Sequence, residues 1–280
     1  MPGETRLESA VAMLAPGWEY SNPVQHAPLL GDNSIHLWAL DLKQNETDLA
    51  TYLSETDLQR AGRIAQAGKR RLYLGGRAGM KCLLSAYNGV PARDLEFAYG
   101  ARGKPVLADS MPAPGIHFNY SLSQDKVLYA FSADRELGVD MEALPRRTNA
   151  ELLARRSLTQ SERTAWMGLP HSVRNDAMLC CWTRKEAYGK ALGVGIRYYL
   201  NEVDLFSCPS SFRFSTSRTG LFKETNKAVM PGLLNGLQIE MPFPAVAALM
   251  YSVGNGQTGN PQVQGKQLVL SDGRNQPVSH

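Results

Sequence analysis

Cysteine is scarce in this chain, with four in 280 residues and no Cys-x-x-Cys pair among them. Such a count lacks the density of a secreted disulfide scaffold and the spacing of a zinc site. Long apolar runs are also missing, since no stretch approaches the roughly twenty apolar residues that cross a bilayer. Glu4 and Glu8 interrupt the apolar residues of the N-terminal segment, unlike a secretory signal peptide. We therefore expect a cytoplasmic protein with reduced thiols.

Composition sets broad limits on the fold. Hydrophobic residues make up 43% of the 280 positions and charged residues 20%, a usage typical of a globular protein with a substantial core. This length suits one large domain or two modest ones. The net charge of +4 is mild and by itself does not indicate nucleic acid, while acidic partners and phosphorylated small molecules remain compatible.

Acidic residues are missing from one segment, Leu58 to Arg93, in which eight basic residues occur. These are Arg60, Arg63, Lys69, Arg70, Arg71, Arg77, Lys81 and Arg93. A solvated basic surface explains such a block, and so does a face that binds nucleic acid or a phosphate. No RNP or zinc-finger motif accompanies the block, which weakens the nucleic-acid interpretation.

The segment from Trp182 to Lys190 combines acidic and basic residues at helical spacing. In a helix, Trp182, Glu186 and Lys190 share one stripe, and Lys185 points about a quarter-turn away. An ordinary stabilising pair of Glu and Lys four residues apart has this pattern. A site that presents a carboxylate and an ammonium group to one ligand has it as well.

A second acidic pattern lies upstream, where the apolar run from Leu137 ends in Asp140 and Glu142. Alternate side chains of a strand share a face, so these two carboxylates point the same way and repel unless a cation lies between them. An exposed strand end is the simpler interpretation. Asp140, Glu142 and Glu186 together would suit Mg²⁺ bound with a phosphate ester, because Mg²⁺ takes carboxylate and phosphate oxygens.

Gly138 to Glu142 followed by Trp182 to Lys190 resembles the paired signature of the 4'-phosphopantetheinyl transferases. Further segments match the family in the same order. They are Leu53 to Arg63, Tyr73 to Arg77, Tyr99 to Pro105 with its Gly-Lys-Pro element, and His117-Phe118-Asn119-Tyr120-Ser121. The likeness covers about residues 50 to 205 and is greatest to the surfactin-type (Sfp-like) monomeric branch.

This resemblance implies that the chain is an Mg²⁺-dependent enzyme with coenzyme A as its substrate. Such an enzyme transfers the 4'-phosphopantetheine arm to a serine of an apo acyl or peptidyl carrier protein and releases 3',5'-ADP. Carrier proteins of this kind serve fatty acid and secondary metabolite biosynthesis. The resemblance further implies a monomer that binds neither nucleic acid nor a membrane.

The resemblance also assigns roles to residues. Asp140, Glu142 and Glu186 would hold Mg²⁺, and Glu186 and Lys190 would act in catalysis. Whether Glu186 takes the proton of the serine or only binds the metal stays open, because a metal-bound carboxylate is a poorer base. The expected coenzyme A contacts are Arg60, Arg63, Arg70, Lys104, Pro105, Asn119, Ser121, Lys185 and Lys190.

The expected fold is α+β. The resemblance implies two similar halves, each a small, mostly antiparallel sheet with a long helix, and an active site in the cleft between them; the sequence itself shows no clear repeat. We expect an extended lead-in over 1–33, an N-terminal half over 34–135, a C-terminal half over 136–253 and a poorly ordered tail over 254–280.

One position departs from the family pattern. Leu122 stands where relatives carry a histidine that is expected to donate a hydrogen bond to a coenzyme A phosphate. Leucine has no donor, so a coenzyme A or carrier-protein binding module with weakened catalysis is the alternative function. A surplus of arginines in the basic segment would compensate for this loss, because a guanidinium grips a phosphate through two hydrogen bonds.

Overall fold

We analysed a computed structural model of the chain. The structure describes residues 19–21, 29–43, 49–100, 103–112, 115–146, 148–194, 201–206, 211–215, 233–239, 241–253 and 261–268. None of the helices in these ranges combines the length and the apolar character that crossing a membrane requires.

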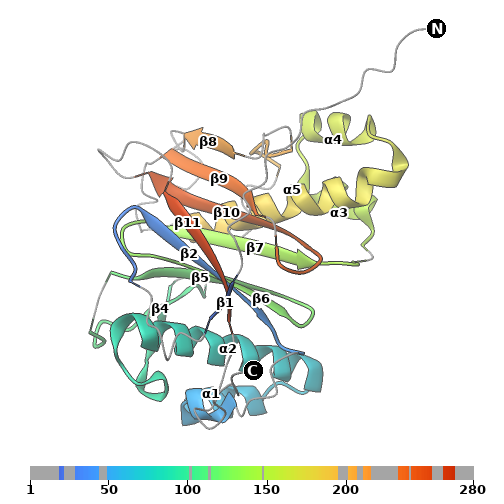
Figure 1. The fold of residues 1–280 in the computed structure, drawn as a ribbon. Coiled ribbons are helices and arrows are strands. Elements are labelled where there is room, and N and C mark those ends of the chain that lie inside the picture. The colour runs from blue at the N-terminus through green and yellow to red at the C-terminus, as the bar shows by residue number, and fades with distance from the viewer. Residues whose placement is uncertain are drawn as a thin grey trace, which may run out of the picture.

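Two sheets form the centre of the molecule (Figure 1). The first has the order β1-β11-β2-β6-β5, and its strands are β1 (Glu19–Ser21), β11 (Gln262–Leu268), β2 (Ser34–Asp41), β6 (Lys126–Ser132) and β5 (His117–Ser123). The second has the order β7-β10-β9-β8, and its strands are β7 (Leu137–Ala143), β10 (Ala245–Val253), β9 (Leu233–Ile239) and β8 (Ser211–Ser215). Strands β3 (Phe97–Tyr99) and β4 (Pro105–Leu107) pair separately.

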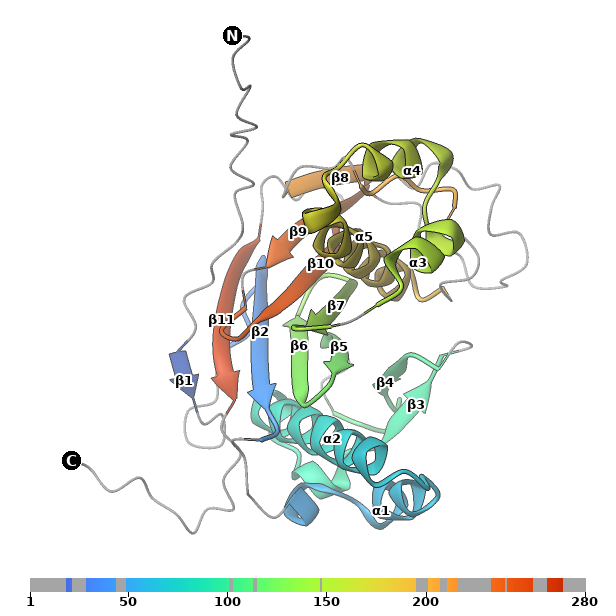
Figure 2. The same cartoon turned by 90° about the vertical axis from the view of Figure 1, so that its right-hand side faces the viewer.

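Helices cover the outer faces of the two sheets, as the two perpendicular views show (Figures 1 and 2). On the side of the first sheet lie the short helix η1 (Leu49–Tyr52), α1 (Glu55–Gly62), α2 (Ala67–Asn88) and η2 (Ala92–Asp94). On the side of the second sheet lie α3 (Ala150–Ser157), α4 (Gln160–Met167) and α5 (His171–Leu192).

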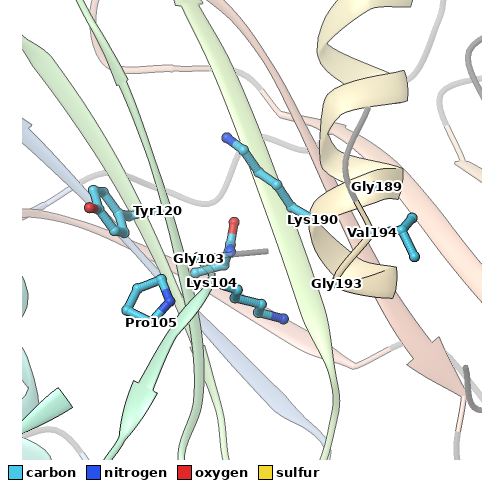
Figure 3. A pocket seen from close by; sticks show the side chains of 9 residues that line it. Gly103, Lys104, Pro105, Tyr120, Gly189, Lys190, Gly193 and Val194 are labelled. Carbon is cyan, nitrogen blue, oxygen red and sulfur yellow. The ribbon is translucent and has the colours of Figure 1, made fainter. Parts of the chain in front are cut away.

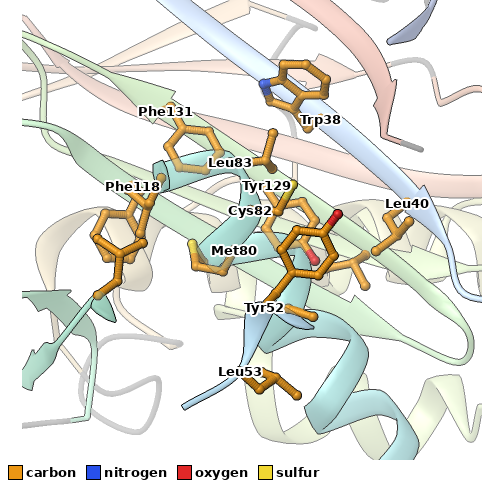
Figure 4. Close-up of a cluster of buried hydrophobic side chains, with 14 of the residues drawn as sticks. Trp38, Leu40, Tyr52, Leu53, Met80, Cys82, Leu83, Phe118, Tyr129 and Phe131 are labelled. Atoms are coloured by element: carbon orange, nitrogen blue, oxygen red, sulfur yellow. The ribbon is translucent and has the colours of Figure 1, made fainter. Parts of the chain in front are cut away.

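Alternation along the strands produces this layering, because successive side chains of a strand point to opposite faces. In β2, Trp38 and Leu40 pack against α2, whereas Ile35 and Leu37 pack toward the second sheet. Figure 4 shows the first of these clusters, in which aromatic side chains of β5 and β6 meet helix α2.

The same alternation places the acidic motif. Leu137, Val139 and Met141 of β7 point into the core between the sheets. The intervening residues Asp140 and Glu142 therefore point to the other face, toward α5.

Glycine lets helix α5 approach β7 closely. A Cβ atom built on Gly138 would lie 2.3 Å from the backbone oxygen of Ala187 and 2.3 Å from the backbone nitrogen of Ala191. Any side chain at this position would thus push the helix away from the strand. The glycine in the Gly-Val-Asp motif therefore has a packing reason, and the close contact brings Lys190 of α5 next to the strand that carries Asp140.

Local signals set the ends of several elements. A turn at Gln124 and Asp125 joins β5 to β6, and Gln124 adopts a positive φ of 53° there. A capping box formed by Thr159 and Glu162 begins α4. Helix α2 is continuous despite its internal glycines, and α5 begins at His171.

Two expectations need correction. We expected a poorly ordered tail over 254–280, but Gln262–Leu268 forms β11, which lies between β1 and β2 and is parallel to both. The first sheet is consequently mixed and not mostly antiparallel, whereas the second is antiparallel throughout its described pairs. That the two halves are equivalent stays a prediction.

Candidate active site

A cavity of about 280 Å³ lies where the elements of the two sheets meet. One wall comes from the Gly-Lys-Pro element and β5, and the other from the C-terminal end of α5 (Figure 3). The lining residues are Gly103, Lys104, Pro105, Asn119, Tyr120, Gly189, Lys190, Gly193 and Val194. Four of them, Lys104, Pro105, Asn119 and Lys190, are residues that the sequence predicted to contact coenzyme A.

Lys190 links this cavity to the acidic motif of β7. Its Nζ atom donates to Oδ1 of Asp140 at 2.7 Å and to the backbone oxygen of Val139 at 3.0 Å. The side chain of Lys190 is 28% exposed and lines the cavity. A lysine held in this way can neutralise negative charge on a phosphate.

Glu186 lies one helical turn before Lys190 and interacts electrostatically with Asp140. Burial raises the pKa of Glu186 to about 7, and the negative charge of Asp140 adds to this increase, while Lys190 opposes it. The Oδ2 atom of Asp140 is buried and has no hydrogen-bond partner among the described residues. A buried carboxylate oxygen without a partner, close to a second carboxylate, fits a site for a hard cation.

Glu142, the third predicted metal ligand, is engaged elsewhere. Its Oε2 atom accepts a hydrogen bond from Ser123 Oγ at 2.8 Å and also pairs with the guanidinium of Arg146. Within the described ranges, no three His, Cys, Asp or Glu side chains converge into a ready metal site. Asp140 and Glu186 are thus the residues that fit Mg²⁺ best, because this ion commonly takes only one or two carboxylates together with phosphate oxygens.

Asn119 and Ser121 bind the neighbouring strand. The Oδ1 atom of Asn119 accepts from the backbone N–H of Val139 at 3.0 Å. Ser121 Oγ donates to Asp140 Oδ1 at 2.8 Å, so its single proton is not available to a phosphate in this arrangement. The expected coenzyme A contact of Ser121 stays a prediction, and Asn119 lines the cavity.

Lys185 also departs from its expected role. We predicted that it contacts coenzyme A, but its side chain is fully buried, and Nζ donates to Glu162 Oε2 at 2.6 Å and to the backbone oxygen of Val203 at 2.7 Å. Glu162 is itself fully buried and accepts from the backbone N–H groups of Leu205 and Phe206. Lys185 therefore fastens α5 to α4 and to the segment around 205 instead of facing the cavity.

The basic segment divides into buried and exposed parts. Arg77 and Lys81 are buried and share Asp57, with Arg77 Nε at 3.0 Å from Oδ1 and Lys81 Nζ at 2.6 Å from Oδ2. These cations hold α2 to α1. Burial raises the pKa of Asp57, but the hydrogen bonds of Lys81 and Ser54 and the charges of Arg77 and Lys81 together outweigh it and keep this pKa below its usual value.

The three arginines that the sequence assigned to coenzyme A are exposed. Arg60 donates to the hydroxyl of Tyr99 at 2.9 Å and lies over its ring, and Arg70 donates to the backbone oxygen of Ile64 at 3.1 Å. Arg63 caps the C-terminal end of α1 through its backbone. None of the three lines the cavity, so their role in phosphate binding stays a prediction.

Lys104 of the Gly-Lys-Pro element is held at the cavity wall by Glu136. Its Nζ atom lies 3.1 Å from Glu136 Oε2, and His117 Nδ1 lies 3.1 Å from Oε1 of the same carboxylate. The hydrogen bond from His117 and the charge of Lys104 lower the pKa of Glu136 to about 2. Glu136 is thus ionised at neutral pH and keeps the lysine at the entrance to β4.

Leu122, where the family histidine is missing, packs against helix α2. A Cβ atom built on Gly76 would lie 2.9 Å from Leu122 Cδ2, which shows how closely the side chain covers the helix. The leucine is about one third exposed.

The predicted site residues leave out five residues that line the cavity, namely Gly103, Tyr120, Gly189, Gly193 and Val194. Gly103, Tyr120 and Gly189 lie inside the quoted motifs, and Gly193 ends α5 in the left-handed conformation with φ 66°. A helix-ending glycine directly after a motif was the available signal, because it opens backbone to a ligand.

Comparison with known proteins adds a second line of information. Residues 136–229 match the family described as the 4'-phosphopantetheinyl transferase superfamily. The chain is 37% identical over 185 residues to the 4'-phosphopantetheinyl transferase HetI of Nostoc sp., a match that covers 65% of this chain and 77% of that protein.

Two further relatives match over shorter regions. The chain is 32% identical over 139 residues to the 4'-phosphopantetheinyl transferase AcpT of Escherichia coli, covering 50% of this chain and 66% of AcpT. It is 26% identical over 165 residues to the human L-aminoadipate-semialdehyde dehydrogenase-phosphopantetheinyl transferase, covering 54% of this chain and 52% of that protein.

Proposed function

The chain belongs to the 4'-phosphopantetheinyl transferase superfamily, and from this membership we propose that it transfers the 4'-phosphopantetheine arm of coenzyme A to a serine of an apo acyl or peptidyl carrier protein. One observation carries the proposal at the level of the site. Residues of separate motifs, Lys104 and Pro105, Asn119, and Lys190, line one cavity, and Lys190 binds Asp140.

The proposed reaction is a phosphoryl transfer. The serine oxygen attacks the phosphorus that carries the pantetheine arm, a new P–O bond forms, and the P–O bond of the pyrophosphate breaks to release 3',5'-ADP. Lys190 offsets the negative charge of the reacting phosphate, and Lys104 and Asn119 hold coenzyme A against the cavity wall. These contributions are positioning and charge neutralisation, which dominate this class of chemistry.

Asp140 and Glu186 are the residues that would hold Mg²⁺, and Glu142 would join them after release from Arg146. When bound, this ion supplies charge neutralisation at the pyrophosphate. Glu186 has two competing roles, since a carboxylate that binds a cation accepts the proton of the serine less well. A Glu186→Gln variant separates them, because loss of the base slows transfer at saturating Mg²⁺, whereas loss of a ligand raises the Mg²⁺ concentration needed.

To test this function, the whole protein is incubated with coenzyme A, Mg²⁺ and several apo carrier proteins, and the mass of each carrier protein is then measured. We expect a carrier to gain one phosphopantetheine on its serine with the unmodified protein and not with Asp140→Ala. A folded Asp140→Ala protein that modifies the carrier at an undiminished rate would remove the site assignment. No modification of any carrier by the unmodified protein would remove the proposed activity.

Leu122 favours a second candidate function, a coenzyme A or carrier-protein binding module. A charge-assisted hydrogen bond contributes about 1.5–3 kcal/mol, so loss of the family histidine weakens coenzyme A binding by roughly tenfold to a hundredfold unless another group replaces it. Calorimetry with coenzyme A distinguishes the two readings. A protein that binds coenzyme A or a carrier protein but transfers nothing until Leu122→His restores transfer would be such a module.

We also propose that the two halves of the fold are repeats and that the enzyme acts as a monomer of the surfactin-type branch. Support for the repeat comes from the order of the elements. In the first half the chain runs β2, α2, β5, β6, with β6 between its neighbours β2 and β5. In the second it runs β7, α5, β9, β10, with β10 between β7 and β9.

A further inference from the structure

Strand β5 contacts strand β7 through side chains instead of a backbone ladder. Three polar side chains of β5, two residues apart, each accept a backbone N–H of β7. The pairs are Asn119 Oδ1 with Val139 N at 3.0 Å, Ser121 Oγ with Met141 N at 3.2 Å, and Ser123 Oγ with Ala143 N at 3.1 Å. This regular register fixes the first sheet against the second at the strand that carries the acids.

The two serines have a second contact in common. Ser121 Oγ donates to Asp140 Oδ1 and Ser123 Oγ donates to Glu142 Oε2, both at 2.8 Å. Each hydroxyl thus accepts from the N–H that follows an acid in the sequence and donates its one proton to that acid. The accepted N–H holds each oxygen atom beside the acid, and the hydroxyl proton turns toward the acid because the carboxylate is the acceptor within reach.

This arrangement leaves the two oxygens of Asp140 in different states. Oδ1 accepts from both Ser121 and Lys190, whereas Oδ2 is buried and has no partner among the described residues. An unpartnered buried carboxylate oxygen is costly unless a ligand satisfies it. Ser121 therefore holds the carboxylate in the rotation that keeps Oδ2 available.

We propose that Ser121 and Ser123 are positioning residues for the carboxylates of β7, which they orient for Mg²⁺ and its phosphate ligand. The proposal rests on the proposed function, which supplies the cation. In this role each serine acts through the acid that it holds. Groups that orient a metal ligand typically contribute tenfold to a hundredfold in metal affinity.

The two serines differ in importance. Glu142 keeps a second partner, Arg146, when the hydroxyl of Ser123 is removed. Without Ser121, Lys190 is the one side-chain partner that Asp140 keeps among the described residues, and Lys190 is itself needed at the cavity. We expect Ser121→Ala to weaken Mg²⁺ binding about tenfold or more and Ser123→Ala to weaken it less.

The experiment measures Mg²⁺ binding by calorimetry to the whole protein with coenzyme A present, beside the melting temperature and the carrier transfer rate. Ser121→Thr keeps the hydroxyl and should bind Mg²⁺ nearly as the unmodified protein does. Ser132→Ala is the matched structural control, because Ser132 is also a fully buried strand serine with two hydrogen bonds, but it bonds Ser34 and Asp134. This control should lower the melting temperature without changing Mg²⁺ affinity.

If Ser121→Ala does not fold, Ser121→Cys takes its place, since a thiol is a weak donor of similar shape. Unchanged Mg²⁺ affinity in the folded variant, with a melting temperature lowered as in Ser132→Ala, would overturn the proposal. Ser121 would then only stabilise the contact between β5 and β7. Absence of Mg²⁺ binding to the unmodified protein would overturn it too. Mg²⁺ binding that responds to Ser121, without modification of any carrier, would support the positioning role and remove the proposed function instead.

Discussion

The two long helices, α2 and α5, have the same length and the same kind of end, but of the two only α5 lines the cavity. Each has 22 residues and ends at a glycine in the left-handed conformation, Gly89 or Gly193. Each buries a lysine at the same position counted from its first residue, Lys81 or Lys185.

The acids that neutralise these lysines also correspond. Asp57 and Glu162 are each the third residue of a helix, α1 and α4, and each completes the capping box at the start of that helix. Each acid thus begins a short helix and binds the long helix that follows. The same arrangement, a capping-box acid paired with a buried lysine, thus holds each long helix to its neighbouring short helix.

The difference lies in the residues one and five positions after the buried lysine. In α2 they are Cys82 and Ala86, and in α5 they are Glu186 and Lys190. The buried lysine occurs in both helices and has a structural role. The acid and the second lysine that follow it occur in α5 and not in α2. This explains why Lys185, although part of the family signature, is not at the cavity.

The largest expected effect concerns the buried lysines. Lys185→Met leaves Glu162 as an uncompensated buried charge, so we expect the free energy of unfolding to fall by about 3–5 kcal/mol. Lys81→Met should cost less, because Asp57 keeps Arg77 at 3.0 Å. Urea unfolding of both variants checks this order, and a larger loss for Lys81→Met would show that Arg77 does not compensate.

The second effect concerns chemistry. Lys190→Ala removes the ammonium group from the cavity, and we expect transfer to a carrier serine to slow by roughly 10²- to 10³-fold, as for other groups that stabilise developing charge. Carrier mass against time gives the rate, and the unfolding curve should shift little. The exposed Lys43, paired with Asp125, provides the control Lys43→Ala, which should transfer normally. Equal rates for the two variants would refute the assignment of Lys190.

The third effect tests the close contact of α5 with β7. In Gly138→Ala the new Cβ meets backbone atoms of Ala187 and Ala191 at 2.3 Å, which only a shift of the helix can relieve. Overpacking of this kind costs about 1–3 kcal/mol, and transfer should slow because Lys190 moves with the helix. Unfolding and transfer are measured together. Gly62→Ala, where a Cβ meets nothing within 4 Å, is the control.

The local parts of this comparison could be predicted from the sequence. The strand of Asp140 and the helix of Lys190 depend on neighbouring residues, and both are confirmed. Family resemblance supplied the link between the motifs that line the cavity.

Long-range pairing could not be predicted. The partner of Lys185 is Glu162, 23 positions away in the sequence. The contacts of Ser121 depend on the register between β5 and β7, which no local pattern encodes. Likewise, β11 has the sequence QVQGKQL, whose few apolar residues gave no strand signal strong enough to predict pairing with β2.

The smallest effect is expected in α2, at the glycine that Leu122 covers. Gly76→Ala places a Cβ 2.9 Å from Leu122 Cδ2, but this atom is the end of a partly exposed side chain that can turn toward solvent. Alanine also favours a helix over glycine by about 1 kcal/mol, so the two terms nearly cancel and the free energy of unfolding should change by less than about 1 kcal/mol.

Gly75→Ala should cost more, because its Cβ would lie 2.3 Å from Leu42 Cδ2, and Leu42 is buried and cannot turn away. Urea unfolding of Gly76→Ala, Gly75→Ala and Gly138→Ala ranks the three contacts. If Gly76→Ala lowered the free energy of unfolding as much as Gly138→Ala, the side chain of Leu122 would be fixed against α2. The leucine at the position of the family histidine would then have a structural role in the packing of β5 on α2.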